Sequence, residues 1–335
     1  MISSSISSNF PRSKLVLAYY YGWYTAGSWY TGANSFSAAF VPSLGLYNSS
    51  DVRIIDTQIA EASSAGINGF IASWWGPGSQ TDNADRILLN EAAKSNAFAV
   101  TLFYETAIIQ EMNSTVQNEE AKVISDVSYI MSAYGSSPAF MKINNKPVLF
   151  FYNADNWPLQ FWTHISTVVH SEYPALQLIG NSFNSTYLQA FDGESSYVDL
   201  GFSSQPDSVV NNSYPTFNVI SQTAHSLGKL WFATASPGFN ATNDGKSDFP
   251  VVARNGGATF LESWAIAQNS NPDGIIVGTW NEYYEGTSIE PTSAFGDYYL
   301  QLTAQLAMSW RMTGFENPTL FGARIVGDRI FRLQI

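Results

Sequence analysis

The chain has 335 residues, of which 45% are hydrophobic and 13% are charged, which allows a large core and excludes a disordered protein. The formal net charge of −12, with no Lys/Arg-rich stretch, argues against a nucleic-acid partner. The absence of cysteine excludes disulfides, thiolate metal sites and a cysteine nucleophile.

Segments that favour strands alternate with segments that favour helices, in eight rounds. The strand-like runs are mostly apolar throughout, which is typical of strands buried on both faces. Strands are predicted at 15–21, 67–74, 98–104, 147–152, 176–180, 197–202, 230–234 and 275–279. Helices are predicted at 51–65, from 82 or 83 to 95, and at 115–134, 158–172, 217–227, 258–268 and 297–312, so that the fifth round has none.

This alternation predicts a single (β/α)8 barrel, an α/β fold of parallel strands. A doubly wound open sheet is the alternative, but no Gly-x-Gly-x-x-Gly turn follows the first strand. We expect a Ser-rich segment at 1–14, the barrel at 15–312, and a tail at 313–335 that packs on the barrel.

Polar and aromatic residues gather where the predicted strands end, the place where barrels carry their functional residues. Two carboxylates and an amide among aromatic rings suit chemistry on a sugar, since rings stack on pyranose faces and carboxylates move protons. The aromatic content of 15% fits such a surface, and equally an aromatic core. The candidates are Tyr19, Tyr21, Trp74, Trp75, Glu105, Tyr152, Asn281, Glu282, Tyr283, Tyr284 and Glu285.

Neither a metal nor another cofactor is predicted. The three histidines, His164, His170 and His225, lack the spacing of metal ligands. No run reaches the ~18 apolar residues of a membrane span, and residues 1–13 do not look like a signal peptide. The acidic composition and five Asn-x-Ser/Thr acceptors favour an extracellular or cell-surface glycoprotein; the acceptors are Asn48, Asn113, Asn184, Asn211 and Asn240.

Several motifs resemble those of glycoside hydrolase family 99, the endo-α-1,2-mannosidases and mannanases, over about residues 15–303. They include Lys-Pro-Val-Leu-Phe-Phe-Tyr at 146–152 and Ser-Pro-Gly-Phe at 236–239. The others are Tyr-Tyr-Tyr-Gly-Trp-Tyr at 19–24, Gly-Ile-Asn-Gly-Phe-Ile-Ala-Ser-Trp-Trp-Gly at 66–76, Phe-Tyr-Glu at 103–105, and Asn-Glu-Tyr-Tyr-Glu-Gly-Thr-Ser-Ile-Glu-Pro at 281–291. The last motif resembles the family's Asn-Glu-Trp-His-Glu-Gly-Thr-Gln-Ile-Glu.

The resemblance implies a retaining endo-glycosidase acting on an oligo- or polysaccharide. It implies that Glu282 removes the proton of the sugar 2-OH, giving a 1,2-anhydro sugar, and that Glu285 is the acid/base. Glu105 would hold sugar hydroxyls, whereas Tyr19, Trp74 and Tyr152 would form subsite walls. Glu290 is interpreted as a structural residue that ties down its loop.

One departure leaves the sugar open: Tyr283-Tyr284 stands where the family has Trp-His. Mannose is the default, and an α-linked glucose polymer, as cut by the related family 71 α-1,3-glucanases, is the alternative. A non-catalytic glycan-binding protein and a surface or virion structural protein are further hypotheses. The presence of Glu105, Glu282 and Glu285 together favours catalysis.

Overall fold

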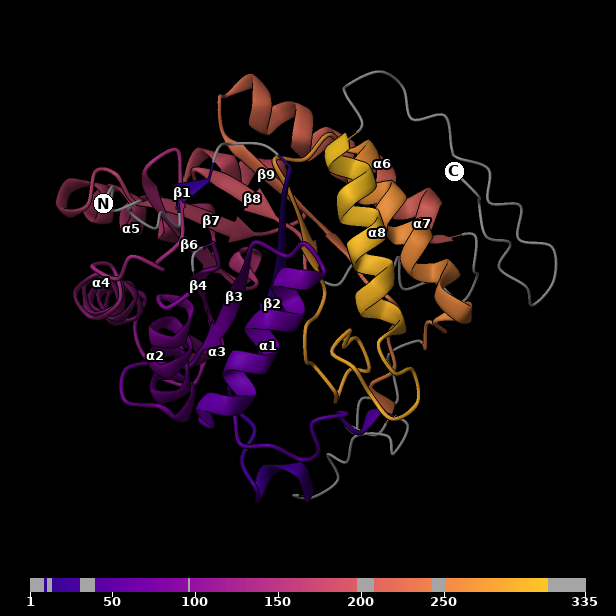
Figure 1. Cartoon of the computed structure of the whole chain (residues 1–335). Coiled ribbons are helices and arrows are strands. Elements are labelled where there is room, and N and C mark those ends of the chain that lie inside the picture. The colour runs from indigo at the N-terminus through magenta and orange to yellow at the C-terminus, as the bar shows by residue number, and fades with distance from the viewer. Residues whose placement is uncertain are drawn as a thin grey trace, which may run out of the picture.

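Eight parallel strands close into a barrel inside a ring of helices (Figure 1). The computed structural model describes residues 9–10, 14–30, 40–95, 97–197, 208–242 and 251–312. Each barrel strand pairs with the next one along the chain, and the last pairs with the first, in the register Gly274↔Leu15 to Val277↔Ala18. The strands are β2 (Leu15–Tyr20), β3 (Gly69–Trp74), β4 (Ala99–Tyr104), β6 (Lys146–Phe151), β7 (Gln177–Asn181), β8 (Gly193–Ser195), β9 (Leu230–Ala235) and β10 (Gly274–Val277).

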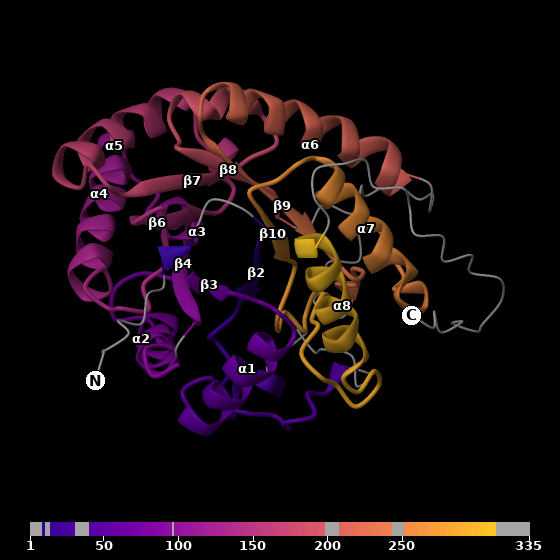
Figure 2. The same cartoon turned by 45° about the horizontal axis from the view of Figure 1, so that its top comes forward.

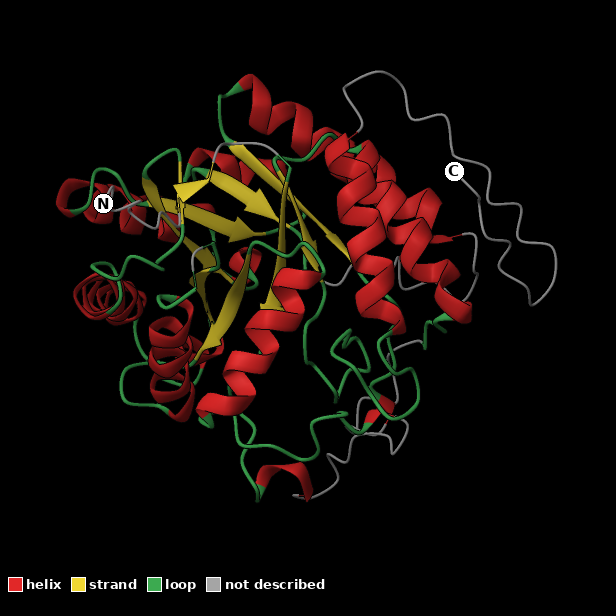
Figure 3. Ribbon diagram, in the orientation of Figure 1, coloured by secondary structure: helices red, strands yellow, loops and turns green. Residues whose placement is uncertain are grey.

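The helices follow the strands in turn and surround them, as Figure 2 and Figure 3 show. The predicted (β/α)8 barrel is therefore confirmed. In the fifth round, after β7, the described chain has the 3-10 helix η4 (Ser185–Gln189) and no α-helix, as predicted. The α-helices are α1 (Val52–Ser64), α2 (Gln80–Ala92), α3 (Ala107–Gln110), α4 (Val116–Ala133), α5 (Leu159–Glu172), α6 (Ser208–Ser226), α7 (Ala258–Asn269) and α8 (Tyr298–Met312).

Two short strands extend the sheet at the amino-terminal end of β6. The strand β5 (Lys142–Ile143) forms an antiparallel hairpin with β6, and Asn144 and Asn145 turn it with φ values of 50° and 64°. Positive φ at both central residues is typical of a type I′ turn. The strand β1 (Asn9–Phe10), within the predicted Ser-rich segment, pairs with β5. The predicted tail at 313–335 lies outside the described residues.

The prediction of the sixth strand was wrong in position. The strand β8 ends at Ser195, so Tyr197 lies beyond it, and residues 198–202 lie outside the described part of the chain. The residues Gly193, Glu194 and Ser195 lack the apolar pattern of a buried strand. The sequence therefore predicts the strand in the more apolar stretch that follows them.

Two helices begin earlier than predicted. Ser79 accepts a hydrogen bond from the backbone N–H of Asp82, so α2 begins at Gln80 and Asp82 lies within its first turn. The helix α6 begins at Ser208 although Pro215 lies inside it, and a proline within a helix normally argues against one.

Alternate residues along the strands fill two separate apolar layers. Leu17 and Tyr19 of β2, with Ile71, Phe103 and Ile276 of other strands, lie inside the barrel. The intervening residues of the same strands pack outward against the helices. Every residue of β2, β3 and β4 is buried, which explains why these strands read as continuous apolar runs.

Glu194 is a buried carboxyl on the outer side of this sheet. It is opposite Gly180, while the preceding pair, Ile179 and Gly193, belongs to the inner face. Neither of its oxygens has a hydrogen-bond partner in the described chain. Burial, with a smaller contribution from the charge of Asp155, raises the pKa of Glu194 to about 9.

The raised pKa of Glu194 predicts that this residue lowers the stability of the fold as pH rises, and that Glu194→Gln removes this effect. Between the ordinary pKa of a glutamate and about 9, Glu194 is protonated in the folded chain and ionised in the unfolded one, so its contribution to stability falls as pH rises. We expect the free energy of unfolding of Glu194→Gln, relative to the wild type, to rise by up to about 1.4 kcal/mol per pH unit. Urea unfolding from pH 5 to pH 8 measures it.

Glu172→Gln, a substitution at an exposed glutamate of α5, serves as the control for the loss of one carboxyl. Parallel stability curves for Glu194→Gln and the wild type would contradict the prediction.

Candidate active site

Three glutamates lie where the carboxyl ends of the strands meet, an end called here the mouth of the barrel. Glu105 directly follows β4, and Glu282 and Glu285 lie in the loop after β10. Burial raises the pKa of the Tyr21 phenol well above its ordinary value, and the charges of Glu105, Glu282 and Glu285 raise it further. The three carboxylates, which come from distant parts of the sequence, therefore lie near one phenol.

Glu282 is buried and held by the backbone of its own loop. Its Oε1 accepts hydrogen bonds from the N–H of Tyr284 at 2.8 Å and of Glu285 at 3.4 Å. Its own N–H donates to Thr279 Oγ1 at 2.8 Å. Donors fixed in the backbone orient the carboxylate and stabilise its negative charge.

Glu285 is half-buried and faces two tyrosines. The Tyr197 hydroxyl donates to Glu285 Oε2 at 3.1 Å, and the hydroxyls of Tyr21 and Tyr197 are 2.6 Å apart. The Glu285 carbonyl accepts a hydrogen bond from the N–H of Asn240 at 2.7 Å. Both its backbone and its side chain are thus held at the mouth.

Glu105 is buried beside Ser73, whose Oγ donates to Glu105 Oε1 at 2.6 Å. The indole N–H of Trp75 donates to the same Oγ at 3.0 Å, so Trp75 lies close to this carboxyl. Burial raises the pKa of Glu105 to about 8, and the charge of Glu285 adds to the increase. Near neutral pH Glu105 is mostly protonated and can donate a hydrogen bond.

Tyr152 and Tyr19 adjoin the carboxylates in different ways. Burial raises the pKa of Tyr152, and the charges of Glu105 and Glu285 raise it further, so Tyr152 lies near both acids. Part of its side chain remains exposed to solvent. Tyr19 is fully buried inside the barrel, where its hydroxyl donates to the carbonyl of Ser196 at 2.9 Å. Tyr19 therefore supports the site from within.

Asn281 joins the loop after β10 to the end of β2. Its Oδ1 accepts from the N–H of Tyr21 at 2.8 Å, and its Nδ2 donates to the Tyr21 carbonyl at 3.0 Å. The side chain is completely buried. Its amide is consequently occupied by the protein backbone.

The neighbouring tyrosines of the loop point in different directions. Tyr283 is buried, and its hydroxyl donates to Glu290. Tyr284 is partly exposed; its ring stacks on Tyr24, and its hydroxyl donates to the carbonyl of Ser28 at 2.8 Å. Of the two rings, that of Tyr284 is the one with a surface open to solvent.

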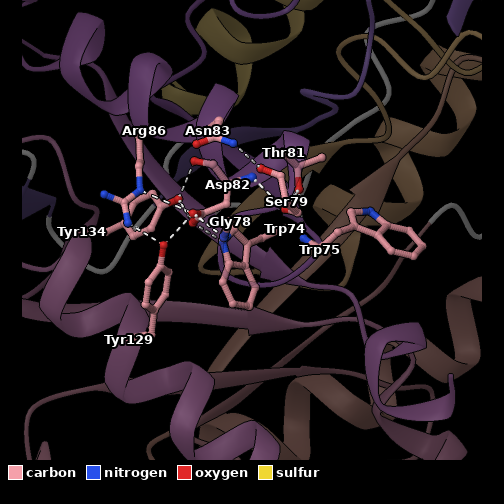
Figure 4. Close-up of polar contacts among 10 residues, drawn as sticks. All are labelled: Trp74, Trp75, Gly78, Ser79, Thr81, Asp82, Asn83, Arg86, Tyr129 and Tyr134. Atoms are coloured by element: carbon pink, nitrogen blue, oxygen red, sulfur yellow. Dashed lines mark hydrogen bonds and ion pairs between the residues drawn. The ribbon is translucent and has the colours of Figure 1, made fainter. Parts of the chain in front are cut away.

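The structure does not bring Trp74 to the mouth. Its indole is fully buried between the outer face of β3 and the helices, and its N–H donates to Asp82 at 2.9 Å (Figure 4). Asp82 also accepts hydrogen bonds from the hydroxyls of Tyr129 and Tyr134, both at 2.6 Å. Figure 4 shows the indole of Trp75 pointing away from this group. Consecutive strand residues face opposite sides, so only one of the two indoles could face the mouth.

Arg254 anchors the segment that follows Glu285. Its Nη2 donates to the carbonyls of Gly286 at 2.9 Å and Ser288 at 2.7 Å. Three rings enclose the guanidinium, at 4.5 to 5.2 Å from its carbon to the ring centres: those of Phe40, Phe295 and Tyr299. Burial lowers the pKa of Arg254 to about 10, so it stays charged at neutral pH.

Neither Tyr197 nor Ser73 was predicted from the sequence as a residue of the site. Tyr197 was placed inside the predicted sixth strand, and the earlier end of β8 puts it at the mouth. Ser73 carried a usable signal, because it lies two residues before Trp75 and shares the inner face of β3 with Ile71.

Within the described part of the chain, no group of three or more His, Cys, Asp or Glu side chains is arranged to hold a metal ion. No described helix combines the length and the apolar character that crossing a membrane requires.

Comparisons with known proteins identify relatives along most of the chain. The family model of Glycosyl hydrolase family 99 matches residues 25–300. Glycoprotein endo-alpha-1,2-mannosidase of Mus musculus is 24% identical over 276 residues, covering 76% of this chain and 56% of that protein. Glycoprotein endo-alpha-1,2-mannosidase-like protein of Mus musculus is 23% identical, covering 81% and 65%. The chain thus spans between about half and two thirds of the length of these curated relatives.

Solved structures share the fold. The GH99 endo-alpha-mannosidase of Bacteroides thetaiotaomicron superposes with a TM-score of 0.71 at 24% identity, covering 89% of this chain and 98% of that one. A family 5 mannosidase of Rhizomucor miehei gives a TM-score of 0.56 at 11% identity, covering 92% and 96%.

The different surroundings of the Trp74 and Trp75 indoles predict that substituting them lowers the free energy of unfolding by different amounts. Trp74→Phe removes a donor from the buried Asp82 carboxylate, and losing a hydrogen bond to a charged group costs about 1.5–3 kcal/mol. Trp75→Phe removes a bond to a hydroxyl at a partly exposed position, which costs about 0.5–1.5 kcal/mol. The free energy of unfolding in urea should rank Trp74→Phe as the less stable variant. An equal or reversed ranking would show that Trp74 is not held as described.

Proposed function

The chain belongs to glycosyl hydrolase family 99, and from this premise we propose that it is an endo-acting glycoside hydrolase that cleaves α-linked mannose glycans. The names of its relatives, which are endo-alpha-1,2-mannosidases, support this substrate class. The observation on which the proposal rests is the convergence of Glu105, Glu282 and Glu285 around Tyr21 at the mouth of the barrel.

Glu282 is proposed as the base. It would take the proton of the sugar 2-OH while that oxygen attacks the anomeric carbon, and the bond from this carbon to the leaving sugar would break. A 1,2-anhydro sugar would result. The backbone donors that hold Glu282 Oε1 support this role, since they orient the carboxylate and stabilise the negative charge it needs to accept a proton.

Glu285 is proposed as the acid that gives its proton to the leaving oxygen. It would then take a proton from water, whose oxygen attacks the anomeric carbon while the bond from that carbon to the 2-oxygen breaks. The 2-oxygen would recover its proton from Glu282. The hydrogen bond from Tyr197 supports this role because it orients Glu285 Oε2. Glu105 is proposed to bind sugar hydroxyls, and its high pKa allows it to donate as well as accept.

Trp75, Tyr152 and Tyr284 are proposed as the rings that contact the sugars. Each is only partly buried and lies beside one of the three acids, either in space or in the sequence. Buried residues are proposed to support these rings from the protein side: Tyr19, Tyr21, Asn281 and Tyr283.

An extracellular or cell-surface location, with glycosylation at Asn-x-Ser/Thr sites, belongs to the same proposal. The acidic composition, poor in lysine, supports it.

Incubation with separate panels of α-mannan and α-glucan substrates tests the activity. We expect the wild type to release oligosaccharides of several lengths from α-mannan early in the reaction, because an endo-acting enzyme cuts within chains. Glu285→Gln should lower the rate about 10²–10⁴-fold, the usual contribution of general acid–base catalysis. Chromatography of the products over time measures both effects.

Glu172→Gln, an exposed substitution on α5, should keep the wild-type rate. Cleavage of α-glucan alone would replace mannose by glucose in the proposal. The absence of any cleavage, with the folded protein verified by its circular dichroism, would refute it.

A substrate whose 2-OH is replaced by fluorine separates the two mechanisms open to a retaining enzyme. If Glu282 acts on the 2-OH, the fluorinated substrate cannot react and the mass of the protein stays unchanged. If Glu282 is instead a nucleophile, a glycosyl ester accumulates on it. We expect no adduct by intact-protein mass spectrometry. A labelled peptide that contains Glu282 would contradict the 2-OH mechanism while leaving the hydrolase proposal intact.

A further inference from the structure

Glu290 lies in the same loop as Glu282 and Glu285 but points into the protein. It is 2% exposed. Its carboxylate accepts hydrogen bonds from three side chains: Gln58 Nε2 at 2.7 Å, the Tyr47 hydroxyl at 2.8 Å, and the Tyr283 hydroxyl. These donors come from α1, from the segment before α1, and from the loop itself. One carboxylate therefore joins three separate parts of the chain.

Two of the donors connect Glu290 to the loop that holds the proposed catalytic residues. Tyr283 directly follows Glu282 in the sequence. The Tyr47 hydroxyl accepts a hydrogen bond from Asn281 Nδ2 at 3.1 Å, and Asn281 in turn binds the backbone of Tyr21. Tyr283, on one side of Glu282, thus binds the Glu290 carboxylate directly. Asn281, on the other side, is linked to it through the Tyr47 hydroxyl.

The third donor connects Glu290 to the barrel wall. Gln58 Oε1 accepts from the hydroxyl of Tyr20, the last residue of β2, at 3.0 Å. The backbone N–H of Glu290 donates to the carbonyl of Trp280 at 2.9 Å. These contacts tie the end of the loop to its beginning and to the neighbouring strand.

The negative charge of Glu290 matches these contacts. An ionised carboxylate has only acceptors, whereas a protonated one must use one oxygen as a donor and cannot accept from all three partners in the same geometry. The titratable groups that face it are Tyr47 and Tyr283, with Tyr20 and Glu61 close enough to affect its charge. Burial raises its pKa, its three donors lower it, and Glu61 raises it further, to about 7.

We propose that Glu290 is a positioning residue for the proposed hydrolysis, on which this inference rests. By accepting from Tyr283, Tyr47 and Gln58 it sets the place of Glu282 and Glu285 relative to Glu105, without touching the sugar. Misplacing a reacting group by about 1 Å can cost on the order of 10²-fold in rate, so a distant contact of this kind affects turnover more than binding.

Glu290→Gln is the first test, because it keeps the size of the side chain and removes the charge. We expect kcat on α-mannan to fall about 10- to 100-fold while KM changes less than about threefold. Tyr283→Phe and Tyr47→Phe should lower kcat in the same way by smaller factors. These two variants also test the inference if Glu290→Gln does not fold. Glu194→Gln, a substitution at an equally buried acid on the outer side of β8, should keep the wild-type kcat.

The pH profile separates positioning from general stability. In the wild type and in Glu194→Gln, kcat should fall as pH decreases through about 7, where Glu290 becomes protonated. In Glu290→Gln this step should be absent. An unchanged kcat in Glu290→Gln, or a reduced kcat with the wild-type step retained, would overturn the inference and leave the hydrolase proposal standing.

Crystal structures of the wild type and Glu290→Gln provide a measurement that needs no activity. A shift of the Glu282 carboxyl by about 1 Å or more relative to Glu105 would support positioning. Superposable carboxyls would overturn it. If the wild type cleaves none of the substrates, the proposed function fails, and these structures alone decide whether Glu290 sets the loop.

Discussion

The pairing of the last barrel strand with the first is the interaction on which the site depends. The pairing between β10 and β2 continues beyond the end of β10, where the N–H of Trp280 donates to the carbonyl of Tyr19 at 2.8 Å and Asn281 binds the backbone of Tyr21. Residues separated by about 260 positions thereby form one surface. This junction holds the loop of Glu282 and Glu285 beside Tyr21.

The polar groups at the mouth are held mainly by neutral donors. Tyr197 donates to Glu285, Ser73 to Glu105, and Tyr283 to Glu290. Salt bridges between lysine or arginine and an acid occur instead on the helices or just beside them, as in Lys94–Glu91 and Lys122–Asp126. A buried acid without a cationic partner binds its proton more tightly, and the pKa values of Glu105 and Glu290 are raised accordingly. The protonation of Glu105 and Glu290 can therefore change near neutral pH.

The sequence allowed the barrel to be predicted because its strands are buried on both faces and its helices carry clear end signals, such as Asp51 and Thr115 at their N-caps. The short strand β8 escaped detection because it contains a glutamate and a glycine, and its buried environment exists only after the fold has formed. The face of β3 to which the Trp74 side chain points depends on its place in the alternation along the strand. A shift of one residue in that alternation would turn the side chain to the opposite face. The partners of Glu290 could not be inferred at all, since Gln58 and Tyr47 reach it only through the closed tertiary structure.

The enclosure of Arg254 should make its hold on the loop after β10 insensitive to salt. Its Nε and Nη1 atoms are buried, and aromatic rings surround the guanidinium in place of water. Dissolved ions screen exposed charges within about 10 Å at 0.1 M ionic strength but screen buried charges much less. The attraction of this cation for the carbonyls of Gly286 and Ser288 should therefore depend little on the ionic strength of the medium.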